Sequence, residues 1–162
     1  MPLFRRTKPE PEPEAPPAAE AKAPVRVLVV DDEEDLRALL QTALEREGFD
    51  VVGATGSAET ALALVEHEPH PDIVLLDLHM PDVTGLDLMP QILERAPDTK
   101  IVACSSMENS YMVEATIEAG ATSYIVKGVS VRSIAQHLHR VAESGRMKMV
   151  RPYPLRQDYR ND

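Results

Sequence analysis

Residues 25–33 read Val-Arg-Val-Leu-Val-Val-Asp-Asp-Glu, a short β-branched run that ends abruptly in acidic side chains. A continuous apolar run of this length is typical of a buried strand in a parallel sheet, where both faces of the strand are covered. From Leu36 to Leu44 the apolar side chains recur at helical spacing, and this amphipathic segment is expected to end near Gly48. The pattern predicts a strand followed by a helix that packs on the sheet.

The same strand–helix pattern recurs four more times along the chain. Further strands are expected at 50–54, 73–76, 101–104 and 122–126, and further helices at 58–67, 86–95, 108–119 and 131–144. Pro90 falls in the first turns of the third helix, where the lost hydrogen bond matters least, and Ser130 is expected to cap the last helix. Such regular alternation predicts an α/β fold, a doubly wound parallel sheet of five strands with helices on both faces.

Composition divides the 162 residues, whose formal net charge is −10, into three parts. Residues 1–24 hold seven of the 14 prolines among Glu and Ala, which predicts a disordered arm. Residues 25–145 form the predicted domain, with 21 acidic and 8 basic side chains, and an acidic surface disfavours direct DNA binding. Residues 146–162 form a basic tail; a frayed terminus and a segment that packs on the acidic domain or docks a partner both remain open.

Several classes of protein are disfavoured by simple features. The single cysteine, Cys104, excludes an intramolecular disulfide and a multi-cysteine zinc site. No apolar run reaches the roughly 18 residues of a transmembrane helix. The first residues lack the apolar segment of a signal peptide, so a cytoplasmic location is expected. Only 18 residues follow Ser144, so we expect a stand-alone domain whose output is a protein–protein contact or runs through its two tails.

Polar side chains follow four of the five predicted strands, at the sheet edge where parallel α/β proteins bind ligands. The first strand is followed by Asp31 and Asp32, the third by Asp77, the fourth by Ser105 and Ser106, and the fifth by Lys127. One of the two serines is expected to cap the next helix and the other to serve the site.

The three carboxylates, Asp31, Asp32 and Asp77, meet if the first and third strands are neighbours. Two like charges 4 Å apart repel by about 4 kcal/mol at an effective dielectric constant near 20. Such a cluster either takes up protons or binds a cation, and oxygen ligands alone favour Mg²⁺ or Mn²⁺. A helix dipole accounts for Asp32 but not for Asp77. Lys127, facing the carboxylates, is expected to pair with them and to contact a phosphate group.

Taken in order, these residues resemble a bacterial response-regulator receiver domain of two-component signalling. The resemblance covers 25–144 and rests on four motifs: Val-Leu-Val-Val-Asp31-Asp32-Glu33, then Ile-Val-Leu-Leu-Asp77-Leu-His-Met-Pro81 with Gly85, then Val-Ala-Cys-Ser105-Ser106, and Gly120-Ala-Thr-Ser-Tyr124-Ile-Val-Lys127. It implies a flavodoxin-like sheet of strand order 2-1-3-4-5 with five helices. One departure is Gly128, which stands where many receivers carry proline.

The resemblance also implies a role for each site residue. Asp77 would accept a phosphoryl group from a histidine kinase, a phosphotransfer protein or a small donor. Lys127 would pair with Asp77 and then with the phosphoryl oxygens. Ser105, 22 residues before Lys127, would be the switch hydroxyl in preference to Ser106, and Tyr124 the switch aromatic. The ligands of Mg²⁺ would be Asp32, Asp77 and the backbone carbonyl of His79, with Asp31 acting through water.

The function implied is a phosphorylation-activated switch. Its changing surface would be the fourth helix, fifth strand and fifth helix, and an output protein or a second copy of the chain would bind there. The domain would not be an enzyme, beyond taking up and slowly losing its own phosphoryl group.

Of three alternative functions, two would need other sequence features. A Mg²⁺-dependent phosphohydrolase that uses an aspartyl phosphate would need a second carboxylate two residues after Asp77, where His79 stands. A nucleotide-binding domain would need a Gly-rich phosphate loop after the first strand, and none follows it. A receiver-like scaffold that takes no phosphate stays open, although all five key side chains are present: Asp31, Asp32, Asp77, Ser105 and Lys127.

Overall fold

The computed structural model describes residues 22–107 and 109–144, so the basic tail and nearly all of the proline-rich arm lie outside the described residues. Five strands alternate with five helices, as predicted. The elements are β1 (Arg26–Val30), α1 (Glu34–Arg46), β2 (Asp50–Thr55), α2 (Ala58–Glu66), β3 (Ile73–Asp77), α3 (Gly85–Arg95), β4 (Lys100–Ser105), α4 (Ser110–Glu118), β5 (Ser123–Val126) and α5 (Val131–Glu143).

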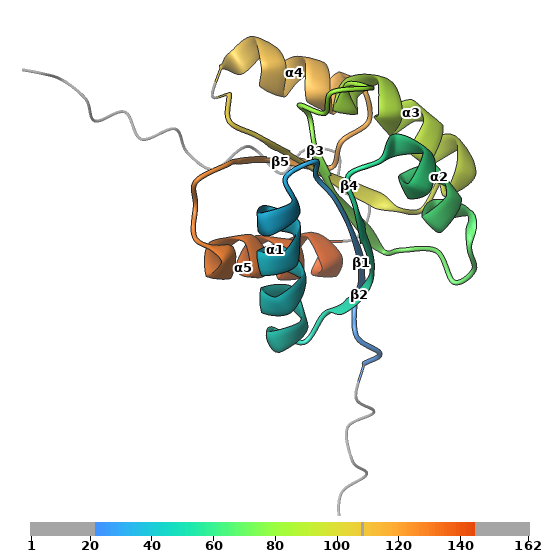
Figure 1. Cartoon of the computed structure of the whole chain (residues 1–162), viewed down its shortest axis with the longest axis vertical. Helices are drawn as coiled ribbons and strands as arrows, with labels where there is room; N and C mark the ends of the chain where they lie inside the picture. Colours follow the sequence, from blue (N-terminus) through green and yellow to red (C-terminus); the bar gives the residue numbers. More distant parts are fainter. Residues whose placement is uncertain (1–21, 108, 145–162) are drawn as a thin grey trace, which may run out of the picture.

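The five strands form one parallel sheet of order β2-β1-β3-β4-β5, which confirms the predicted fold and strand order. Helices α1 and α5 cover one face of the sheet, and α2, α3 and α4 cover the other (Figure 1). The order reverses between β1 and β3, because the chain first adds β2 outside β1 and then returns to the other side. The carboxyl ends of these two central strands therefore lie side by side.

The side chains of β1 alternate between two apolar cores. Val27 and Val29 pack in the layer of α1 and α5, together with Leu44. Leu28 and Val30 pack in the layer of the other three helices. Because both faces of the strand are covered, its four residues from Val27 to Val30 are all apolar instead of alternating with polar residues.

Most helices begin at a polar cap. The side chains of Ser57, Thr84, Asn109 and Ser130 each accept a hydrogen bond from a backbone N–H in the first turn of the helix that follows. The cap predicted at Ser130 is therefore confirmed. Helix α4 starts at Ser110, later than the predicted 108, because Asn109 caps it. The expectation that Ser105 or Ser106 caps this helix is wrong.

The outer strand β2 carries a β-bulge that the sequence pattern did not indicate. Val27 of β1 pairs with Val51, whereas Leu28 pairs with Gly53, so Val52 is left without a partner in the register. Val52 is 37% exposed. A bulge distorts an edge strand and disfavours its pairing with another chain.

The core of the α1 and α5 layer provides a test of the packing. Leu138 of α5 is fully buried in the cluster that includes Leu44 and Val102. We expect Leu138→Ala to lower the free energy of unfolding by about 3 kcal/mol, because it removes buried apolar contacts and leaves a cavity. Urea titration followed by circular dichroism measures this. Gln136→Ala, at an exposed position of the same helix, serves as the control; equal effects of the two substitutions would contradict the assigned packing.

Candidate functional site

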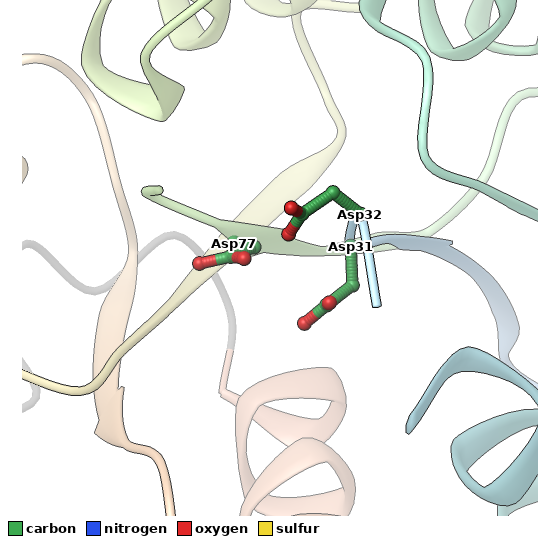
Figure 2. A group of neighbouring side chains, drawn as sticks. All are labelled: Asp31, Asp32 and Asp77. Atoms are coloured by element: carbon green, nitrogen blue, oxygen red, sulfur yellow. The ribbon is translucent and has the colours of Figure 1, made fainter. Parts of the chain in front are cut away.

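Three aspartates gather at the carboxyl ends of the two central strands. Val30 pairs with Leu76, so the next residues, Asp31 and Asp77, leave neighbouring strands at the same level. Carboxylate oxygens of Asp31, Asp32 and Asp77 lie within 4.8 Å of one another. Figure 2 shows Asp31 and Asp32 after the end of β1 and Asp77 at the end of β3. Asp31 and Asp77 are only 3% and 2% exposed, whereas Asp32 is exposed.

Lys127 reaches this cluster from the end of β5. Its Nζ lies 2.9 Å from Asp31 Oδ2 and 2.9 Å from Asp77 Oδ2, so one ammonium pairs with both buried carboxylates. Burial by itself lowers the pKa of Lys127, but the hydrogen bonds and charges of the two aspartates outweigh it, and the net pKa lies above that of an ordinary lysine. Lys127 is therefore a permanent cation in the site.

The carboxylate of Asp77 is held on both sides. Its Oδ1 accepts a hydrogen bond of 3.0 Å from the backbone N–H of His79, and its Oδ2 accepts one from Lys127. Burial nevertheless raises the pKa of Asp77 above its usual value; the bonds from His79 and Lys127 only partly offset this, and the neighbouring Asp31 adds to it. Burial thus disfavours the ionised form of Asp77, and a further cation beside it would stabilise that form.

The donor set fits a hard divalent cation. Three carboxylates supply oxygen only, and the exposure of Asp32 leaves space for metal-bound water, which Mg²⁺ retains in proteins. The amide of His79 fixes the turn after Asp77. That the backbone carbonyl of His79 also binds the cation stays a prediction.

Ser105 ends β4 next to Asp77 and is fully buried, whereas Ser106 is exposed. The Ser105 hydroxyl accepts a hydrogen bond of 3.1 Å from the backbone N–H of Met107 and lies 3.3 Å from Nδ1 of His79. The carbonyl of Met107 in turn accepts a hydrogen bond from the hydroxyl of Tyr124, which is 5% exposed. One loop residue, Met107, therefore joins the predicted switch serine to the predicted switch tyrosine.

Two glycines are required by the local backbone. A Cβ at Gly85 would lie 2.7 Å from the carbonyl oxygen of Asp77, so α3 starts against the strand end that carries the buried carboxylate. Gly128 has φ +100°, a conformation that the proline ring, fixed near −65°, cannot adopt. Proline, which many receivers carry at this position, would therefore not fit the loop after Lys127 as it is shaped here.

Two further residues at the site were missed by sequence reasoning. Arg37 donates hydrogen bonds from Nη1 to the backbone carbonyls of Asp31 and Asp32. A basic side chain two residues after the acidic run 31–35 was the available signal. Cys104 pairs with Asp77 in the sheet register, and burial raises the pKa of its thiol to about 12, which keeps it protonated and inert.

Comparison with known proteins agrees with this geometry. The sequence profile of the family described as the response regulator receiver domain matches residues 27–139. The chain belongs to this family. The chemotaxis protein CheY of Thermotoga maritima is 34% identical over 118 residues, which cover 73% of this chain and 98% of that protein. The response regulator GacA of Pseudomonas viridiflava is 35% identical over 118 residues, covering 72% of this chain and 55% of GacA.

Solved structures of response regulators also match this chain. The CheX–CheY–BeF₃–Mg²⁺ complex from Borrelia burgdorferi contains a chain that matches with a TM-score of 0.68 and 28% identity, over 73% of this chain and 89% of that one. The receiver domain of the response regulator NarL from Mycobacterium tuberculosis matches with a TM-score of 0.69 and 25% identity, over 75% of this chain and 98% of that one.

The family places the chain in two-component signalling. Receiver domains are phosphorylation-activated switches, generally depend on Mg²⁺, and are generally not enzymes. Within the described part of this receiver domain, no helix is long and apolar enough to cross a membrane.

The raised pKa of Asp77 has a consequence for stability. An unfolded aspartate has a pKa of about 3.9. Because the folded-state value is higher, the protonated carboxyl favours folding below the unfolded pKa, and this contribution is lost as pH rises through the folded pKa. We expect Asp77→Asn to raise the urea midpoint at pH 7 in the presence of a chelator, and the gain to shrink as pH falls towards 4.

Asp82→Asn, at an exposed loop position, is the matched control. It is expected to change the midpoint little at either pH. A midpoint of Asp77→Asn that is lower than that of the wild type at pH 7 would contradict the assignment of Asp77 as an under-compensated buried anion.

Proposed function

We propose that this receiver domain is switched by transfer of a phosphoryl group to Asp77 from a histidine kinase, a phosphotransfer protein or a small donor. The observation that supports it best is a buried carboxylate with a raised pKa that shares one ammonium with a second carboxylate, beside a third. An oxygen of Asp77 forms the new P–O bond as the P–N bond of phosphohistidine breaks, and the departing imidazole takes up a proton.

The residues that would hold Mg²⁺ are Asp31, Asp32 and Asp77, together with the carbonyl of His79, and Mn²⁺ would fit the same oxygen ligands. The cation neutralises charge on the transferring phosphoryl oxygens when bound. The chain's own contribution is placement: the paired ends of β1 and β3 set the carboxylates at one level before any ligand arrives.

Lys127 changes partners during the reaction. It pairs with Asp77 and Asp31 before transfer. Once one oxygen of Asp77 is part of the acyl phosphate, the negative charge lies mainly on the phosphoryl oxygens, and the ammonium follows it. Asp31 keeps Lys127 near the site throughout, because it is bonded to the same Nζ.

Ser105 and Tyr124 carry the change outward. The Ser105 hydroxyl turns to donate a hydrogen bond to the phosphoryl group and draws the loop after β4 inward. Met107 is hydrogen-bonded to both residues through its backbone and moves with the loop. Its carbonyl, which accepts the hydrogen bond from the Tyr124 hydroxyl, is thereby displaced. Helix α4 responds at low cost, since among its residues only Thr116 is fully buried.

The output surface proposed is therefore the face of α4, β5 and α5. Met107, Tyr111 and Val129 are exposed there or on the adjoining loops, with Tyr111 as much as 76% exposed. These side chains suit an output protein or a second copy of the chain that buries apolar surface on binding. A cytoplasmic location and the lack of direct DNA binding stay predictions.

Phosphorylation can be tested directly. We expect incubation with Mg²⁺ and acetyl phosphate to add one phosphoryl group, measured by intact-mass spectrometry, and the adduct to be released by hydroxylamine because it is an acyl phosphate. Asp77→Ala is expected to remain unmodified. If the wild type gains no adduct and binds no beryllofluoride, the phosphate-independent scaffold is the correct function instead.

The role of Ser105 can be separated from acceptance of the phosphoryl group. We expect Ser105→Ala to bind beryllofluoride at Asp77 but to lose most amide shift changes on α4 and β5 in two-dimensional NMR spectra, because the hydroxyl that couples the site to Met107 is gone. Ser106→Ala is the matched control, since this neighbouring serine is exposed. If the amide shift changes persist in Ser105→Ala and vanish in Ser106→Ala, the switch residue is Ser106 and not Ser105.

A further inference from the structure

We propose that Arg37 is a positioning residue for the cation site: its guanidinium holds the Asp31–Asp32 backbone so that both carboxylates face Asp77. This inference rests on the proposed function, because it takes these carboxylates as the ligands of Mg²⁺. Arg37 itself touches neither the cation nor the phosphoryl group in this arrangement and acts only through the loop after β1.

The contact is specific. Nη1 of Arg37 donates a hydrogen bond of 2.8 Å to the carbonyl of Asp31 and one of 3.0 Å to the carbonyl of Asp32. One nitrogen thus bridges two successive carbonyls of the loop that carries the ligands. Bonds from an ionised donor are shorter and stronger than neutral ones, and the guanidinium stays charged at every working pH.

The loop needs such a bond because its helix lacks the usual cap. Helices α2 to α5 each have an N-cap side chain that binds the first turn. At α1 the N-cap residue is Glu33, and its side chain makes no cap hydrogen bond. The loop is held instead by Asp31 Oδ1, which accepts from the N–H of Glu33, by the N–H of Asp31, which donates to Thr55, and by Arg37.

A second loop is shaped around the same guanidinium. A Cβ at Gly56, after β2, would lie 2.8 Å from Nη1 of Arg37, 3.1 Å from Cα of Asp32 and 3.2 Å from the carbonyl oxygen of Asp31. A residue with a side chain would push the guanidinium or the loop away. The bridge between Arg37 and the loop therefore occupies the space beside Gly56.

If only its charge mattered, Arg37 would weaken cation binding instead of supporting it. A positive side chain near a cation site repels the cation, so its removal would strengthen binding if electrostatics dominated. If Arg37 orients the ligands, its removal weakens binding instead. The sign of the change in Mg²⁺ affinity therefore distinguishes the two roles.

The experiment compares the wild type with Arg37→Met and Arg37→Lys in the full chain. The matched control is Arg46→Met, which removes the same charge from an exposed position in the last turn of the same helix. Dissociation constants without any phosphoryl donor are measured for Mn²⁺ from the electron paramagnetic resonance signal of the free ion, and for Mg²⁺ by competition. Circular dichroism and thermal unfolding confirm that each variant is folded.

We expect Arg37→Met to weaken cation binding about tenfold, as is typical when a group that orients metal ligands is removed. Arg37→Lys is expected to recover part of this loss, because its ammonium still donates to the carbonyls, and Arg46→Met to bind as the wild type does. Phosphorylation of Arg37→Met by acetyl phosphate is expected to need more Mg²⁺ but to approach the wild-type rate at saturation. Gly56→Ala, a second variant, is expected to weaken binding in the same direction.

Equal or tighter cation binding by Arg37→Met and Gly56→Ala would overturn the inference while leaving the carboxylate site intact. A rate loss that saturating Mg²⁺ does not restore would also overturn it, because Arg37 would then act on a later step. If the wild type and Arg46→Met both bind no cation and accept no phosphoryl group, the proposed function itself fails, and the role of Arg37 falls with it.

Discussion

The structure depends on one ammonium group shared by two buried carboxylates. Asp31 and Asp77 lose nearly all contact with water where β1 and β3 end, and Lys127 is the cation within hydrogen-bonding distance of both. Without it, two adjacent buried anions would repel each other and lack solvation. Its single charge does not balance the three carboxylates of the site, and burial raises the pKa of Asp77 more than the hydrogen bonds and charge of its neighbours lower it. Three carboxylates gathered in this way supply the oxygen ligands that suit a hard divalent cation.

The sheet is what keeps such a cluster in place. Its central strands are buried on both faces, so the carboxylates are attached to the most rigid part of the domain. In the proposed switch, the response to phosphorylation would fall on more lightly packed elements. The loop after β4 connects Ser105 to Tyr124 through Met107, and α4 beyond it buries little. The fold thus separates the buried carboxylates from the lightly packed elements that the proposed switch would move.

Much of the fold was predictable because each segment carried its own signal. Apolar runs marked the strands, helical spacing marked the helices, and strict alternation required a parallel sheet. The residues expected at the site do converge, since parallel strands bring their ends to one edge. The features missed were those set by neighbours distant in sequence or by local competition. Val52 bulges because the register between β1 and β2 shifts at this point, and Asn109, not Ser105 or Ser106, caps α4.

The sequence by itself determined the fold class, the strand boundaries to within one residue and the residue types at the strand ends, because burial and helical periodicity act over a few neighbouring residues. Only the tertiary structure decided how those residues pair. That Lys127 bonds both Asp31 and Asp77, and that Arg37 bridges two carbonyls of the loop after β1, depends on distances between separate elements. Such distances come from packing of the whole sheet and its helices, which no local pattern encodes.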